Sequence, residues 1–201
     1  MAEKFAFEYG EVSVAFMSHS GALGDIIIAK SVFEAVTKLV PNCKIDILYL
    51  TESAKANFKA FYGTDKNLNR MVNAHNFYDE NIRKYDAALR VWHTVYVDWA
   101  NVDRLEVAAP NFLQSLYGIS KYNEKGTDPT AVFLRNVTRA HITGINRYTC
   151  LSCDGALPIS DNRVEISLLP EKEPAFRELH LSENYITIGS NLNVNARFNL
   201  K

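Results

Sequence analysis

The sequence has no long apolar run and almost no net charge. None of its apolar stretches reaches the roughly 18 residues of a membrane-spanning helix. The first residues also hold no apolar segment long enough for a secretory signal. The formal net charge of −1 gives no general field that would attract nucleic acid or anionic membranes. We therefore expect a cytoplasmic protein that does not bind nucleic acid.

Cysteine is scarce as well, with three in the chain. An odd, sparse count argues against a disulfide scaffold. Cys150 and Cys153 have the C-x-x-C spacing, but no second pair follows, and a metal site would need further ligands such as His141 or Asp154. The Asp154-Gly155 sequence favours a turn, whereas a redox pair requires a helix start. We therefore expect ordinary thiols and no bound metal.

The chain does contain alternating strand-like and helix-like segments. A short apolar run at 12–17 predicts a buried strand, and the apolar residues of 25–40 recur at three- and four-residue spacing on one helix face. Further strands are predicted at 44–50, 68–72, 85–92 and 163–168, a helix or turn at 79–84, and helices at 53–61 and 105–117, the last one stopped by Gly118. This order predicts an α/β protein with a Rossmann-like parallel sheet and flanking helices.

The composition changes near residue 169. The segment 169–183 is charged and carries two prolines, which is typical of an interdomain connection. A new β-rich run at 185–189 is followed by no helix that could cover it. We therefore expect a first domain at 1–168, a linker at 169–183 and the start of a second, truncated domain at 184–201.

Residues 18–50 are the most informative segment. They read Ser-His-Ser-Gly-Ala-Leu-Gly-Asp25, then a helix to Val40, then Pro41-Asn-Cys-Lys-Ile-Asp-Ile-Leu48. This pattern resembles the start of bacterial heptosyltransferases of glycosyltransferase family 9, which have the GT-B architecture. Weaker matches follow in order at 84–89, 111–119 and 185–190. Lys30-Ser31 departs from the family, which often has proline there.

The resemblance implies a two-domain enzyme with its active site between the domains. The first half would bind a glycan or lipopolysaccharide-core acceptor, and the second half a nucleotide-sugar donor. This chain would then be mainly the acceptor half and inactive alone. The resemblance further implies no cofactor and at most peripheral contact with the cytoplasmic face of the inner membrane.

For sugar transfer with inversion, the resemblance assigns Asp25 as the general base. The backbone of Ser20, Gly21 and Gly24 would let sugar and phosphates approach closely, and His19 could contact the acceptor. The donor phosphates would meet Ser190, Arg197 and Lys201. Asp25 also has a simpler interpretation, because an acid at a helix start caps free amides and complements the helix dipole.

Several side chains near predicted strand ends are weaker candidates for ligand contact. They are His75, Arg90, Trp92 and His93, with Tyr96, Trp99 and Tyr117 as further aromatic surface. Arginine and tryptophan suit sugar or phosphate recognition. For the histidines the alternative is a solvated loop side chain, and for the aromatic residues it is packing in the core.

Two other functions share the predicted sheet. A dinucleotide-binding oxidoreductase would need a complete G-x-G-x-x-G, but the loop has glycines only at 21 and 24, and Glu52 is the one acid near the end of the second strand. A non-catalytic sugar- or partner-binding module would have the same half-fold. Loss of transfer in an Asp25→Asn variant would separate an enzyme from such a module.

Overall fold

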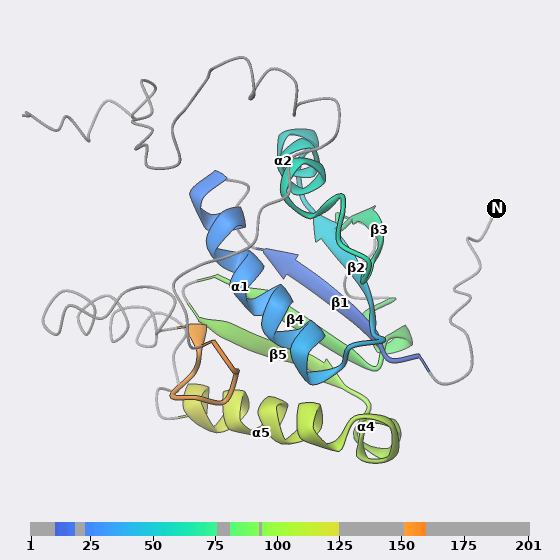
Figure 1. Cartoon of the computed structure of the whole chain (residues 1–201), viewed down its shortest axis with the longest axis vertical. Helices are drawn as coiled ribbons and strands as arrows, with labels where there is room; N and C mark the ends of the chain where they lie inside the picture. The colour runs from blue at the N-terminus through green and yellow to red at the C-terminus, as the bar shows by residue number, and fades with distance from the viewer. Residues whose placement is uncertain (1–10, 19–22, 76–80, 93, 125–150, 160–201) are drawn as a thin grey trace, which may run out of the picture. The chain divides into compact units, whose positions relative to one another are not determined.

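The computed structural model describes residues 11–18, 23–75, 81–92, 94–124 and 151–159 (Figure 1). All of them belong to one compact unit, Met1–Ser167, and a second unit comprises Leu168–Lys201. The predicted strand at 163–168, the linker and the second domain lie outside the described residues. In the described part of the chain, no helix combines the length and apolarity needed to cross a membrane.

The centre of the unit is a five-stranded sheet in the order β3-β2-β1-β4-β5. Its strands are β1 Ser13–Ser18, β2 Lys44–Tyr49, β3 Leu68–Asn73, β4 Ala87–Val91 and β5 Val95–Ala100. The first four strands are parallel, and β5 runs antiparallel to β4. The predicted α/β fold with a mostly parallel, Rossmann-like sheet is therefore confirmed.

The helices begin and end at residues whose chemistry explains the boundaries. They are α1 Leu23–Leu39, α2 Glu52–Tyr62, the 3-10 turn η1 Ile82–Lys84, α4 Val102–Ala108 and α5 Pro110–Glu124. The Thr51 hydroxyl accepts the Ala54 amide at 3.2 Å and caps α2. The Asn101 side chain caps α4 in the same way through the Arg104 amide. Proline at position 41 prevents α1 from continuing.

Two predictions on the last helices are wrong. The single helix expected at 105–117 is two helices, because Pro110 has no amide to continue α4 and instead starts α5. Gly118 does not stop the helix but lies inside α5. A Cβ placed on Gly118 would lie 2.8 Å from the Cβ of Ala156, so the glycine allows residues 151–159 to pack on α5.

The antiparallel strand β5 was not predicted. Its central residues, Tyr96 to Trp99, are only partly buried, and charge at Asp98 interrupts the apolar alternation. A register shift between Ala88 and Leu89 brings Asp98 opposite no residue of β4. A strand with this irregular pattern lacks the continuous apolar run that marked β1.

The main core lies between the sheet and helices α1, α2 and α5, with α1 in front of the sheet in Figure 1. Four aromatic side chains fill its centre, with neighbouring ring centroids 5.1 to 6.4 Å apart: Phe16, Phe33, Phe58 and Tyr62. Ala15 and Met17 of β1 are buried in a second, smaller cluster on the other side of the sheet. Strand β1 is thus covered on both faces, as its apolar run predicted.

The second cluster surrounds a fully buried carboxylate, Asp46 of β2. Its oxygens accept bonds from the Asn69 amide at 2.8 Å, the Arg70 Nε at 2.9 Å and the Tyr85 hydroxyl at 2.6 Å. These donors compensate for the loss of water around the charge. Burial, and then the bond to Asp46, raise the pKa of Tyr85 well above its ordinary value. This network fixes β2 against β3 and the start of β4.

A second buried carboxylate, Asp86, joins the amino ends of β1 and β4. One oxygen accepts the Ser13 amide at 2.8 Å and the Ser13 hydroxyl at 2.9 Å. The other oxygen pairs with the Arg104 guanidinium at 2.5 Å, and Arg104 also donates to the carbonyl of Glu11. The pairing of the two central strands is therefore set by side chains as well as by the sheet ladder.

Candidate functional site at the carboxyl edge of the sheet

The strand order reverses at β1. The chain runs from β1 outward through β2 and β3, then crosses to the other side of β1 to form β4. In an open α/β sheet the carboxyl ends of two such diverging strands leave a crevice where ligands bind. The first turn of α1, which follows β1, stands at this reversal point. The sequence predicted a ligand site at this edge but could not predict the strand order.

Gly24 and Asp25 lie in that first turn. Gly24 is exposed, and a Cβ placed on it would meet no other described residue within 4 Å, so none of these residues hinders the approach of a ligand to the backbone there. Asp25 is partly exposed. A carboxylate in a first helical turn is stabilised by the helix dipole and the nearby free amides. The other residues predicted for this loop, His19, Ser20 and Gly21, lie outside the described residues.

The carboxyl end of β4 carries Arg90, a candidate for sugar or phosphate recognition. Its guanidinium forms two bonds with the Asp98 carboxylate, at 2.9 and 3.0 Å, and lies over the Tyr96 ring, 4.8 Å from the centroid. These contacts tie β4 to β5 and already occupy much of the donor fork. Trp92, one residue past β4, is partly buried. His93 lies outside the described residues.

The remaining candidates are spread over the structure. His75 is exposed just after β3, two strands away from β1, and its amide donates to the Asn73 side chain at 3.0 Å. Trp99 donates to the Tyr85 carbonyl at 2.9 Å and packs against the second cluster. Tyr117 is half exposed on α5. Ser190, Arg197 and Lys201, predicted for the donor phosphates, lie outside the described residues.

Residues 151–159 form the turn that Asp154-Gly155 predicted. Cys153, Asp154 and Gly155 all have positive φ, at 51°, 56° and 91°. Two non-glycine residues in this region are uncommon and strained. The turn lies against the start of β5, where the Thr94 hydroxyl is 3.4 Å from the Cys153 sulfur.

The thiols of Cys43 and Cys153 are buried and form no disulfide within the described residues. Burial raises the pKa of Cys43 to about 11, although a bond from the Asn67 amide partly opposes this shift. Cys43 therefore remains a protonated, unreactive thiol at neutral pH. Cys150 lies outside the described residues. Within the described ranges, no group of three His, Cys, Asp or Glu residues is arranged to hold a metal ion.

Two buried polar atoms near β5 have no hydrogen-bond partner among the described residues: the Tyr96 hydroxyl and the Asn123 side-chain oxygen. Burial also raises the pKa of Tyr96. The amide nitrogen of Asn123 is satisfied, since it donates to the Val95 carbonyl at 2.7 Å. Buried polar groups without a partner lower the free energy of unfolding. The packing of the end of α5 against the start of β5 therefore includes two destabilising groups.

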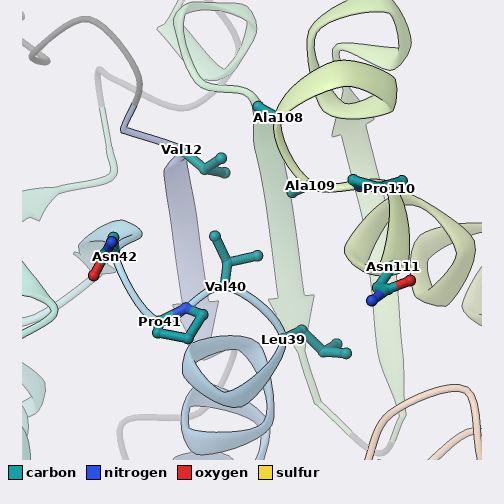
Figure 2. Close-up of a pocket in the computed structure, with 9 residues that line it drawn as sticks. All are labelled: Val12, Leu39, Val40, Pro41, Asn42, Ala108, Ala109, Pro110 and Asn111. Atoms are coloured by element: carbon teal, nitrogen blue, oxygen red, sulfur yellow. The ribbon is translucent and has the colours of Figure 1, made fainter.

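A pocket of about 300 Å³ lies at the opposite edge of the sheet (Figure 2). Val12, which precedes β1, lines it together with the end of α1, residues 39–42, and the junction of α4 and α5, residues 108–111. Figure 2 shows the α1 end and the α4–α5 junction on opposite sides of the pocket. No residue predicted for the functional site lines it.

Comparisons of the chain with protein-family models, curated proteins and solved structures found no match.

Proposed function

We propose that this chain is mainly the acceptor half of an inverting glycosyltransferase, with Asp25 as its general base. The observation that carries the proposal is the position of Asp25: a partly exposed carboxylate in the first turn of α1, where the strand order reverses, next to the open backbone of Gly24. The resemblance of residues 18–50 to heptosyltransferases of glycosyltransferase family 9 supports the same role.

In the proposed reaction a nucleotide-sugar donates its sugar to a glycan hydroxyl, such as one in the lipopolysaccharide core. The Asp25 carboxylate takes the hydroxyl proton while the hydroxyl oxygen attacks the anomeric carbon. The bond from that carbon to the diphosphate breaks, and the nucleoside diphosphate leaves with the electron pair. The amides and the positive end of the dipole at the start of α1 stabilise negative charge developing nearby. This chemistry uses cytoplasmic nucleotide-sugars, so we place the protein in the cytoplasm.

The first experiment titrates the 201-residue chain with lipopolysaccharide-core oligosaccharide and with ADP-, GDP- and UDP-sugars by calorimetry. Asp25→Asn is compared with Asp103→Asn, a matched control because Asp103 is an exposed acid in the first turn of α4. We expect saturable oligosaccharide binding that Asp25→Asn weakens about tenfold, since a charge-assisted hydrogen bond is lost. The Asp103→Asn variant should bind like the wild type.

Transfer is then measured on the protein joined to its donor half. We expect Asp25→Asn to lower turnover by roughly 10²- to 10⁴-fold, the usual contribution of a general base. The proposal would be overturned if neither the oligosaccharide nor any of the three nucleotide-sugars bound saturably. Binding without any transfer that depends on Asp25 would favour the non-catalytic sugar-binding module instead.

A further inference from the structure

Three hydrogen bonds join the start of α1 to the C-terminal end of α2 and to Asp65, three residues past that end. The hydroxyl of Tyr62, the last residue of α2, donates to the carbonyl of Ile26 at 2.8 Å. The ammonium of Lys30 donates to the Phe61 carbonyl and to the Asp65 carboxylate, both at 2.8 Å. We name these contacts of Tyr62 and Lys30 the α1–α2 brace.

The brace is made of groups that are costly to bury. Tyr62 is fully buried and Lys30 is 2% exposed. Burial raises the pKa of the Tyr62 hydroxyl well above its ordinary value. The ammonium of Lys30 also lies over the Tyr62 ring, 5.2 Å from its centroid, so its charge meets two oxygens and an aromatic face. Apolar side chains of similar size would pack here without this desolvation cost.

The position of the brace relates it to the candidate site. Ile26 directly follows Asp25, so the Tyr62 bond fixes the carbonyl of the next residue in the chain. Lys30 fixes the following turn of α1 against the end of α2 and against Asp65, which precedes β3. The brace thus restrains the start of α1, the turn that carries Gly24 and Asp25.

We propose that Tyr62 and Lys30 are positioning residues, which hold Asp25 in place for the acceptor hydroxyl. This inference rests on the proposed function, because it assigns a role toward the same site. A general base must lie within hydrogen-bond reach of the proton that it accepts, and a displacement of about 1 Å can cost roughly 10²-fold in rate. The first turn of a helix, whose amides have no partner within the helix itself, frays more readily than the middle of the helix, so tertiary contacts such as the brace limit its movement.

The test combines hydrogen exchange with ligand binding in Tyr62→Phe and Lys30→Met. Tyr62→Phe keeps the ring in the aromatic core and removes only the hydroxyl. In each variant we expect amide exchange at 26–30 to become about tenfold faster than in the wild type, while exchange in β2 and α5 keeps its wild-type rate. Binding of the core oligosaccharide should weaken at least threefold. Lys30→Met tests the second contact if Tyr62→Phe lowers the yield of folded protein.

Tyr85→Phe is the matched control, because it removes another buried hydroxyl that does not touch α1. It should leave exchange at 26–30 unchanged relative to α5, which does not contact the Tyr85 hydroxyl; β2 cannot serve as the reference here because Tyr85 binds Asp46 of that strand. Faster exchange in the brace variants with unchanged oligosaccharide affinity would overturn the positioning role, as would unchanged exchange. If the wild-type chain binds no ligand, the proposed function fails, whereas the exchange data still decide whether the brace holds the turn.

Discussion

At the scale of single residues, the chain contrasts two tyrosines whose hydroxyls are both buried. The Tyr85 hydroxyl donates to the Asp46 carboxylate at 2.6 Å. The Tyr96 hydroxyl has no hydrogen-bond partner in the described part of the chain. A bond to a charged acceptor contributes about 1.5 to 3 kcal/mol, whereas an unpaired buried hydroxyl only costs desolvation free energy. The same kind of group, a buried tyrosine hydroxyl, therefore stabilises the fold at position 85 and destabilises it at position 96.

This contrast predicts opposite effects for the same substitution. Tyr85→Phe should lower the free energy of unfolding by about 1.5 to 3 kcal/mol, because Asp46 loses one of its three donors. Tyr96→Phe should leave it unchanged or raise it by about 1 kcal/mol. Urea denaturation of both variants beside the wild type measures the difference. Equal destabilisation by the two substitutions would contradict the assignment of the hydrogen bonds.

At the scale of elements, helix α5 shows how a glycine inside a helix can be required by a neighbour. Glycine normally costs a helix about 1 kcal/mol relative to alanine. Gly118 nevertheless lies in the middle of α5, because its surface is covered by Ala156 of the turn at 151–159. The glycine lowers the intrinsic stability of α5, but it allows the turn at 151–159 to pack closely against the helix.

Gly118→Ala should therefore destabilise the protein by about 1 to 3 kcal/mol, despite the better helix propensity of alanine. The new Cβ would lie 2.8 Å from that of Ala156, so one of the two elements must move. Ala156→Gly removes the clash, and the double variant should recover most of the lost stability. A double-mutant cycle of melting temperatures checks this expectation, and strictly additive effects would argue against the contact.

The sequence predicted those elements in which a single local signal dominates. The helix of α1 followed from its apolar spacing and from Pro41, and its bounds differ from the prediction by one or two residues. The split between α4 and α5 was missed because the apolar periodicity continues through Pro110. Gly118 was misassigned because its reason, the contact with Ala156, joins residues far apart in the chain.

For the candidate site, the placement of Gly24 and Asp25 at the start of a helix followed from the loop that joins a buried strand to that helix. Their role in the site stays a prediction. The pairing of Arg90 with Asp98 was missed because β5 was not predicted. A salt bridge between two strands can be predicted only when both strands are. The brace of Tyr62 and Lys30 was also missed, since a lysine in a helix normally faces water, and no local pattern indicates that a particular lysine is buried.

At the scale of the whole molecule, the buried thiol of Cys43 links stability to alkaline pH. Its pKa is about 11 in the fold against 9.0 for an unperturbed thiol. The unfolded chain therefore releases this proton at a lower pH than the folded protein does. Between pH 9 and 11 the unfolded state is favoured increasingly, by at most about 1.4 kcal/mol per pH unit. Below pH 9 the thiol is protonated in both states and has no such effect.

Comparison of the wild type with Cys43→Ala isolates this contribution from that of the tyrosines. The alanine variant should be less stable at pH 8, because it leaves a small cavity. Its deficit should shrink as the pH rises from 9 to 10.5, since only the wild type has the thiol to ionise. Free energies of unfolding in urea at several pH values measure the deficit. A deficit that does not change with pH would contradict a raised pKa for Cys43.

The central place of β1 also determines the order in which the fold can arise. Its partner on one side, β2, begins about thirty residues later, but Asp86, which binds Ser13 beside β4, is 73 residues away along the chain. At roughly 5 to 20 residues per second, a ribosome needs about 4 to 15 s to supply that partner. During this time β1, α1 and β2 can already associate, while the other edge of β1 stays unpaired. A chaperone that shields that edge would therefore act in the interval between the synthesis of β2 and that of β4.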